Sequence, residues 1–128
     1  MIESVVNLFK EQAREHKSIK SFYYNRNYEL GNGNESHPVF WLEDPIVGRN
    51  QSNLFIVSVN FSILFWPDSN NEILKLQDLS FSVGLNILER IKIKEKEIGV
   101  MPTWTYVTIR DYYDNNACGC RFSADLTF

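Results

Sequence analysis

The feature that most constrains the fold of this chain is a long alternation of apolar and polar residues, NLFIVSVNFSILFW, at residues 53–66. The apolar members on one side are Val57, Val59, Phe61, Ile63 and Phe65, and the polar members on the other are Ser58, Asn60 and Ser62. A period of two predicts a β-strand with one buried face and one face toward solvent or a partner. At about 3.3 Å per residue this strand would span on the order of 40 Å. We therefore expect it to project beyond its own sheet or to continue a sheet in a neighbouring subunit.

Two segments have the periodicity of amphipathic helices. The first predicts a helix over residues 2–17, and its apolar stripe is Ile2, Val5, Val6, Phe9 and Ala13. The second predicts a helix over about residues 71–92. Its apolar positions are Ile73, Leu76, Val83, Ile87 and Ile91, widened by Leu74, Phe81, Leu85 and Leu88. A stripe this wide predicts burial around much of the second helix.

Three shorter segments are typical of strands, at about residues 19–25, 38–43 and 103–110, and the chain ends in a strict alternation from Cys118 to Phe128. The stretches 26–36 and 45–53 are rich in Gly and Asn and predict loops. This order of elements predicts a single α+β domain over residues 1–128. In that domain a mainly antiparallel sheet of four to five strands is packed on one face by two helices.

Length and charge exclude several classes of protein. The 128 residues suffice for one core, and a net charge of −3 is not the basic footprint of a sequence-specific nucleic-acid binder. No apolar run is long enough to cross a bilayer, and the N-terminus lacks the pattern of a signal peptide, so we expect synthesis in the cytoplasm and no membrane partner. Aromatic residues make up 14% of the chain. That share indicates either a phenylalanine-rich core or aromatic side chains reserved for a partner.

The two cysteines, Cys118 and Cys120, stand two residues apart in the last predicted strand, so both sulfurs are expected to face the core. A C-x-C pair gives at most two ligands where structural zinc needs four, and neither His16 nor His37 stands at a ligand-like spacing. A disulfide between strand residues i and i+2 fits poorly, because their Cα atoms are about 7 Å apart. We interpret the pair as small buried hydrophobes, and DYYDNN before them as the connection of a β-hairpin.

Other candidates for catalysis lack partners in the sequence. Glu43 and Asp44 are adjacent, and adjacent residues of a strand point to opposite faces. Glu35 and His37 are near enough to pair within the predicted loop, but no nucleophile or metal ligand stands beside them. The sequence therefore predicts no catalytic residue, no cofactor and no metal site.

The segments NFSILFW, GLNILERI and WTYVTIRDYYDNNACGCRFSADL, in this order of elements, resemble tail-completion or tail-terminator-like proteins of tailed bacteriophages. The likeness extends to small virion proteins of phages that infect Bacteroidales, including the crAss-like phages. The residues that carry it are Arg110, Asp111, Tyr112, Asp114, Gly119, Arg121 and Phe122, with Pro38, Trp41 and Pro45 in an earlier segment. These motifs are structural and cover most of the chain.

The resemblance implies a virion protein that forms a homo-oligomeric ring at the head–tail junction (neck) or in the tail, joining adjacent virion components around the DNA channel. Its partners would be copies of itself and other neck or tail proteins. The aromatic residues that we expect at such protein contacts are Tyr28, Trp41, Trp66, Tyr112 and Tyr113. Two alternatives remain open: a small hydrolase or ligand-binding enzyme that uses the loop at 26–53, and a monomeric adaptor that binds one protein partner.

Overall fold

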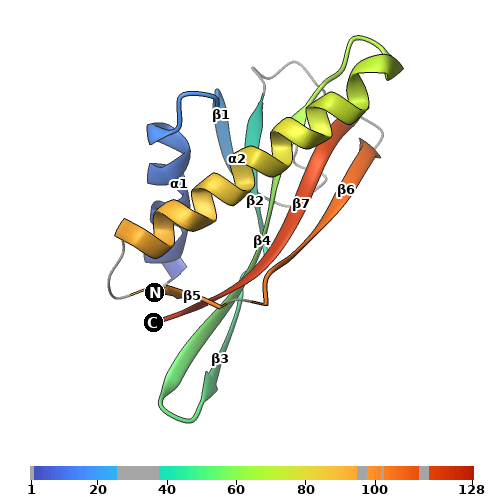
Figure 1. The fold of residues 1–128 in the computed structure, drawn as a ribbon. Helices are drawn as coiled ribbons and strands as arrows, with labels where there is room; N and C mark the ends of the chain where they lie inside the picture. Colours follow the sequence, from blue (N-terminus) through green and yellow to red (C-terminus); the bar gives the residue numbers. More distant parts are fainter. Residues whose placement is uncertain (1, 26–37, 95–97, 102, 113–115) are drawn as a thin grey trace.

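The computed structural model of the chain describes residues 2–25, 38–94, 98–101, 103–112 and 116–128. Within these ranges the chain forms an α+β fold of two α-helices and a seven-stranded mixed sheet, and both helices lie on one face of the sheet (Figure 1). The predicted fold class is confirmed at this level. The sheet contains more strands than the four to five expected, and one of its pairs is parallel.

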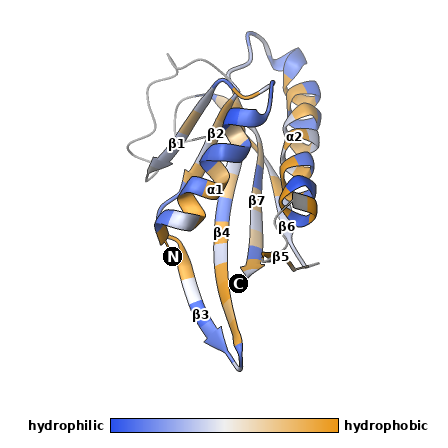
Figure 2. Ribbon diagram, turned by 90° about the vertical axis from the view of Figure 1, so that its left-hand side faces the viewer, coloured by the Kyte–Doolittle hydropathy of each residue, from blue (hydrophilic) through white to orange (hydrophobic). Residues whose placement is uncertain are grey.

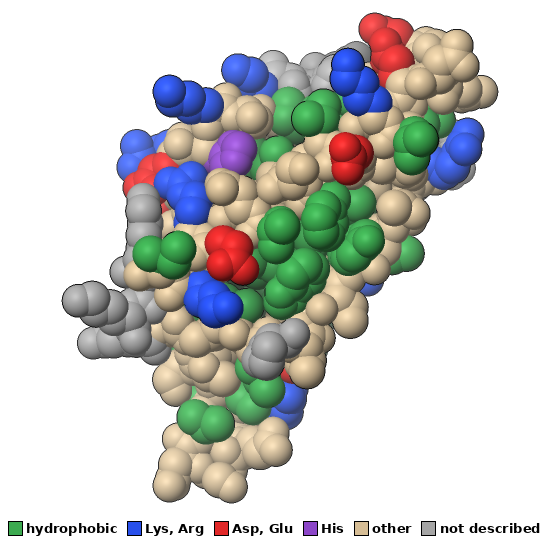
Figure 3. All heavy atoms as spheres, viewed as in Figure 1, with side chains coloured by type: hydrophobic (Ala, Val, Ile, Leu, Met, Phe, Trp, Pro, Cys, Tyr) green, Lys and Arg blue, Asp and Glu red, His purple; other side chains and the backbone are tan. Residues whose placement is uncertain are grey.

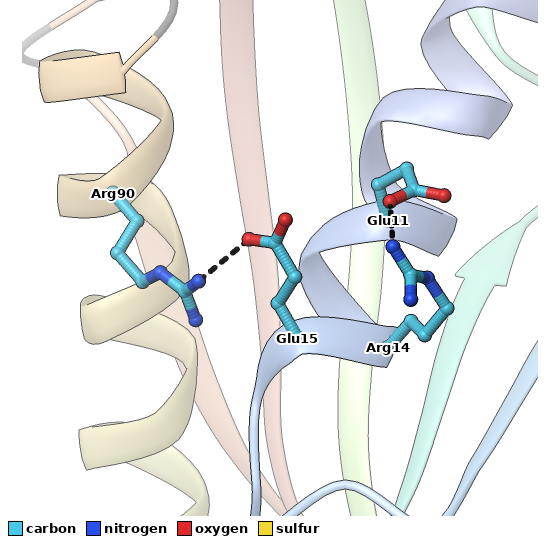
Figure 4. Close-up of polar contacts among 4 residues, drawn as sticks. All are labelled: Glu11, Arg14, Glu15 and Arg90. Atoms are coloured by element: carbon cyan, nitrogen blue, oxygen red, sulfur yellow. Dashed lines mark hydrogen bonds and ion pairs between the residues drawn. The ribbon is translucent and has the colours of Figure 1, made fainter.

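Helix α1 (Ile2–Glu15) buries the side chains of Val5, Phe9 and Ala13 against the sheet, as its apolar stripe predicts. Its exposed face carries an ion pair between Arg14 and Glu11, 2.6 Å long. Glu15, at the end of the helix, accepts a hydrogen bond of 2.8 Å from Arg90 of the second helix (Figure 4). The two helices are therefore linked by charge at the surface of the helical layer.

Helix α2 (Ile73–Lys94) follows the 3-10 turn η2 (Asn70–Glu72) and crosses the sheet diagonally (Figure 1). Its buried apolar residues are Ile73, Val83, Ile87, Leu88 and Ile91. The helix is confirmed, but its apolar stripe is narrower than predicted, because Leu74 has 79% of its surface exposed. The first turn of α2 therefore presents an apolar side chain to solvent.

The strands of the sheet are β1 (Ser21–Asn25), β2 (Val39–Glu43), β3 (Val47–Gln51), β4 (Leu54–Phe65), β5 (Gly99–Val100), β6 (Thr105–Tyr112) and β7 (Ala117–Thr127). The central order is β1-β2-β4-β7, with β5 and β6 pairing in turn along the outer side of β7. Strands β1 and β2 are parallel, and every other described pair is antiparallel. A parallel pair needs a crossover of about a dozen residues, which the sequence between Asn25 and Val39 is long enough to provide.

Strand β3 corrects the prediction of a loop over 45–53. It pairs with the first half of β4, and the turn between them contains Ser52 at a positive φ of 57°. All five residues of β3 are exposed. The polar sequence VGRNQ carries no apolar alternation, so its strand conformation comes from pairing with the long β4 and not from burial. The resulting β3–β4 hairpin projects from the body of the domain (Figures 1 and 2).

The main core lies between the sheet and the two helices, and phenylalanine rings cross it from strand to strand. The ring centroids of Phe9 and Phe40 are 5.9 Å apart, those of Phe40 and Phe61 are 5.1 Å apart, and those of Phe61 and Phe122 are 5.0 Å apart. Much of the aromatic content therefore fills the core, which is the first of the two uses that the composition left open. A smaller cluster of Val39, Trp41, Leu64 and Ala117 lies on the opposite face of the sheet.

Candidate assembly surfaces

Both cysteine side chains are buried, as predicted, with 1% of each exposed. The Cys120 thiol lies 3.4 Å from the carbonyl oxygen of Gln77 in α2, and burial raises the pKa of this thiol above its usual range. Neither cysteine forms a disulfide. Across the part of the chain that the structure describes, no group of three or more His, Cys, Asp or Glu side chains is arranged to hold a metal ion.

The carboxylates considered for catalysis are held by neighbouring side chains. Glu43 accepts two hydrogen bonds from Arg121, of 2.6 and 3.2 Å, and the pair is only partly exposed. Asp44 accepts a hydrogen bond of 3.2 Å from the hydroxyl of Tyr24, and burial with this carboxylate nearby raises the pKa of the tyrosine. Glu35 and His37 lie outside the described residues.

The five aromatic residues expected at protein contacts do not form one surface. Trp41 is 1% exposed within the smaller apolar cluster, which does not agree with a role in contacting a partner. Strand β2, VFWLE, is apolar on both faces, so the sequence did not reveal that Trp41 is buried on the face away from the helices. Trp66 packs partly buried against the same cluster. Tyr28, Tyr113 and the side chain of Tyr112 lie outside the described part of the structure.

A groove of about 800 Å³ lies between the first half of α2 and strand β6. Its lining residues are Asn71, Leu74, Lys75, Gln77, Asp78, Phe81, Tyr106, Thr108 and Cys120. The ring centroids of Phe81 and Tyr106 are 4.7 Å apart, and Tyr106 is 52% exposed. Apolar side chains gather on this face of the molecule beside α2 (Figure 3). Four of the nine lining residues, Leu74, Phe81, Tyr106 and Cys120, are apolar or aromatic, and the volume falls within the range of ligand pockets.

Polar contacts hold the helix wall of this groove to the sheet. The Gln77 side-chain amide donates to the carbonyl oxygen of Ile109 in β6, at 3.0 Å. One turn further along α2, the Ser80 hydroxyl donates to the carbonyl oxygen of Ile63 and accepts from the backbone N–H of Cys120, both at 2.7 Å. The first half of α2 is therefore fixed to the sheet by hydrogen bonds as well as by packing.

Strand β6 is an edge of the sheet, since it pairs only with β7 among the described strands. Its pairing shows which backbone groups face outward. The N–H of Phe128, which follows β7, donates to the carbonyl oxygen of Phe55 in β4. The carbonyl oxygen of Asp125 in β7 accepts from the N–H of Met101, which lies on the opposite side of β7. The backbone N–H and carbonyl groups of the even-numbered residues in β7 therefore point toward β4. Tyr106 and Thr108 stand opposite the even-numbered Phe122 and Cys120, so they turn their backbone groups away from β7.

The β3–β4 hairpin is the second exposed surface. Val47 and Leu54 are 58% and 50% exposed. In the hairpin register Val47 stands opposite Ser58, Arg49 opposite Ile56, and Gln51 opposite Leu54. Alternation along each strand therefore places Val47, Arg49 and Leu54 on one face of the hairpin. Arg49 is held loosely, 3.4 Å from Asp125 and 3.3 Å from Ser58.

Sequence reasoning missed the groove, and the signal that could have found it is weak. Leu74 lies on the predicted apolar stripe of α2, yet it is 79% exposed and lines the groove. The hairpin was expected only as a projection of the long strand. Together the fold and its surfaces define a small α+β domain with an open sheet edge beside a groove and a projecting arm.

The sequence of this chain matches no known family model, and no curated protein is significantly similar to it. Among the described residues, neither helix has the length and apolar character needed to span a membrane.

Proposed function

We propose that this chain is a structural subunit of a tailed bacteriophage particle, and that copies of it assemble into a closed ring at the head–tail junction or in the tail. In this proposal the ring joins adjacent virion components around the DNA channel, without reading the DNA sequence. The motifs described above, from NFSILFW to the C-terminal strand, support the class of protein. The arrangement of exposed surfaces supports the mode of assembly.

The observation that carries the proposal is the presence of two unlike exposed surfaces on one small domain. One is the open edge of β6 with its groove, and the other is the β3–β4 hairpin. A contact between unlike surfaces of identical subunits is heterologous, and it produces a ring when the rotation between neighbours closes. A single self-complementary patch would instead favour a two-fold dimer.

Reconstruction of purified particles by electron cryo-microscopy, with an antibody to this chain as a label, tests the proposal. We expect a closed ring of identical copies around the tail axis. Single copies without contact to one another, or a chain absent from purified particles, would contradict it.

The α2–β6 groove also supports the second candidate, a monomeric adaptor that binds one extended peptide, because a strand edge beside an apolar groove is a common site of peptide binding. An adaptor would occur in the particle as isolated copies, so the same reconstruction separates the two. The enzyme alternative has less support in the described part of residues 26–53, which forms β2 and β3 and in which the carboxylates of Glu43 and Asp44 are engaged by Arg121 and Tyr24.

A further inference from the structure

We infer that the outer edge of β6 and the adjoining groove bind the β3–β4 hairpin of a second copy of this chain. The inference rests on the proposed self-assembly and goes beyond it by naming both halves of the contact. The hairpin would extend the sheet of its neighbour at β6 and place its apolar face against the groove. Addition of a strand to an open sheet edge supplies backbone hydrogen bonds, and the groove supplies side-chain specificity.

The backbone of each surface suits this pairing. Tyr106 and Thr108 direct N–H and carbonyl groups away from β7, and no described strand pairs with them there. Strand β3 has β4 on one side and, within the described residues, no strand on the other. Its five residues are shorter than the eight of β6, so β3 fits along the open edge. Unpaired strand edges are a recurrent source of association between chains.

The side chains of the two surfaces are also complementary. Val47 and Leu54 are half or more exposed on one face of the hairpin. Leu74, Phe81 and Tyr106 form the apolar part of the groove. Bringing these groups together removes apolar surface from water on both partners at once.

Charge favours the same arrangement. Arg49 lies on the same face of the hairpin as Val47 and Leu54, and the hairpin contains no acidic residue. The charged residues that line the groove are Lys75 and Asp78, one of each sign. Arg49, which pairs with Asp125 at 3.4 Å within its own subunit, is opposite in charge to Asp78 in the groove, and opposite charges across a contact help to select the partner and its register.

Two single substitutions and their mixture test the contact. Leu54→Glu charges the hairpin and Leu74→Glu charges the groove, and each position is at least half exposed, so each variant is expected to fold. Ile93→Glu is the matched control, because Ile93 is 75% exposed at the far end of α2, away from the groove. Circular dichroism and thermal unfolding verify folding. Sedimentation velocity at protein concentrations up to the millimolar range measures self-association.

We expect the unmodified chain and Ile93→Glu to self-associate, and each of the other two variants to remain monomeric. An equimolar mixture of Leu54→Glu and Leu74→Glu should form dimers and nothing larger. In that mixture the intact hairpin of Leu74→Glu binds the intact groove of Leu54→Glu, and both remaining surfaces are blocked. A contact between two identical grooves would leave Leu54→Glu unaffected and would give no recovery on mixing.

The inference is overturned if the unmodified chain is monomeric throughout, if Leu54→Glu associates normally, or if mixing restores no dimer. These outcomes are separate from failure of the proposed function. A ring found in particles and built through other surfaces would leave the ring proposal standing and would remove only this contact. If the chain associates through hairpin and groove but is absent from particles, this contact stands and the ring proposal fails.

Discussion

Ser80 is a buried polar residue at the interface of α2 with the sheet, and its hydroxyl stands between two neighbouring strands. It accepts from Cys120 in β7 and donates to Ile63 in β4, so it takes the place of a direct hydrogen bond between them. Next to it, Gly119 has a φ of 152°, and a side chain at that position would overlap the carbonyl oxygen of Ile63. Ser80 thus keeps buried backbone groups of both strands hydrogen-bonded, and the missing side chain at Gly119 leaves room for the close approach of Ile63.

Ser80→Ala should therefore destabilise the fold. The substitution leaves a buried N–H and a buried carbonyl group without their partner, and we expect the free energy of unfolding to fall by about 1–3 kcal/mol. Ser82→Ala is the control, since Ser82 is exposed on the same helix and bonds only its own helix at Asp78. Urea unfolding monitored by tryptophan fluorescence measures both. Equal effects of the two substitutions would show that the Ser80 bridge contributes nothing.

Gly84→Ala tests the closest approach of α2 to the sheet. Alanine favours a helix over glycine by about 1 kcal/mol, so propensity alone predicts stabilisation. A methyl group at Gly84 would, however, overlap the ring of Phe122. We expect the overlap to dominate and to give a net destabilisation of about 1–3 kcal/mol, the usual cost of overpacking. A stabilised variant in calorimetry would show that Phe122 has room to move.

Cys120→Ala should lower stability by roughly 1 kcal/mol, as a small truncation in the core does. The raised pKa of the Cys120 thiol keeps it protonated in the folded chain at neutral pH. Because its pKa is lower in the unfolded chain, the stability that this group contributes should be lost as the pH rises above about 9. Because the variant lacks this thiol, its free energy of unfolding should fall less between pH 8 and pH 10 than that of the unmodified chain. An identical pH profile would contradict this.

At the scale of helices and strands, the sequence predicted every element whose burial follows a simple period. The apolar positions from Val57 to Phe65 in β4 and from Cys118 to Leu126 in β7 alternate in the sequence and are buried as expected, but Ser62, which was predicted on the polar face of β4, is buried as well. Strand β3 was missed because Gly48, Arg49 and Asn50 have no buried face to leave a period in the sequence. The parallel pairing of β1 with β2 depends on contacts between distant segments, which periodicity does not encode.

The candidate site was predictable from the sequence only in part. Burial of Cys118 and Cys120 follows from alternation, and so was predictable. Trp41 was not, since the neighbouring Val39, Phe40 and Leu42 are apolar on both sides of β2. The α2–β6 groove depends on the angle at which the helix crosses the sheet, and no local pattern reports that angle.

Strands β2 and β7 are joined across the sheet by the ion pair of Glu43 with Arg121, which leads to a prediction at this scale. Glu43 is 15% exposed, so Arg121→Ala would leave a largely buried carboxylate without its two charged hydrogen bonds. We expect a loss of about 1–3 kcal/mol in the free energy of unfolding. Arg14→Ala, which breaks an exposed pair with Glu11 on α1, should cause no measurable change. Similar losses of stability in the two variants would show that the partly buried pair of Glu43 and Arg121 contributes no more than the exposed pair of Glu11 and Arg14.

For the whole molecule, amide hydrogen exchange compares the isolated chain with assembled particles. The outward N–H groups of Tyr106 and Thr108, and those of β3, have no partner strand on their outer sides within the described structure. We expect these amides to exchange rapidly in the isolated chain and slowly in particles, while amides between β4 and β7 are protected in both. Equal protection of β6 and β3 in the two states would show that neither edge is used in assembly.

The projecting hairpin has a mechanical consequence, because its strand β4 is also the central strand of the domain. From Ile56 opposite Thr127 to Phe65 opposite Cys118, β4 is paired with β7 along nearly its whole length inside the body. A pulling force on the arm along β4 therefore acts parallel to the strands, and the hydrogen bonds of this ladder resist it together and not one after another. A pull at the tip of the arm would therefore be transmitted along β4 into the core of the subunit.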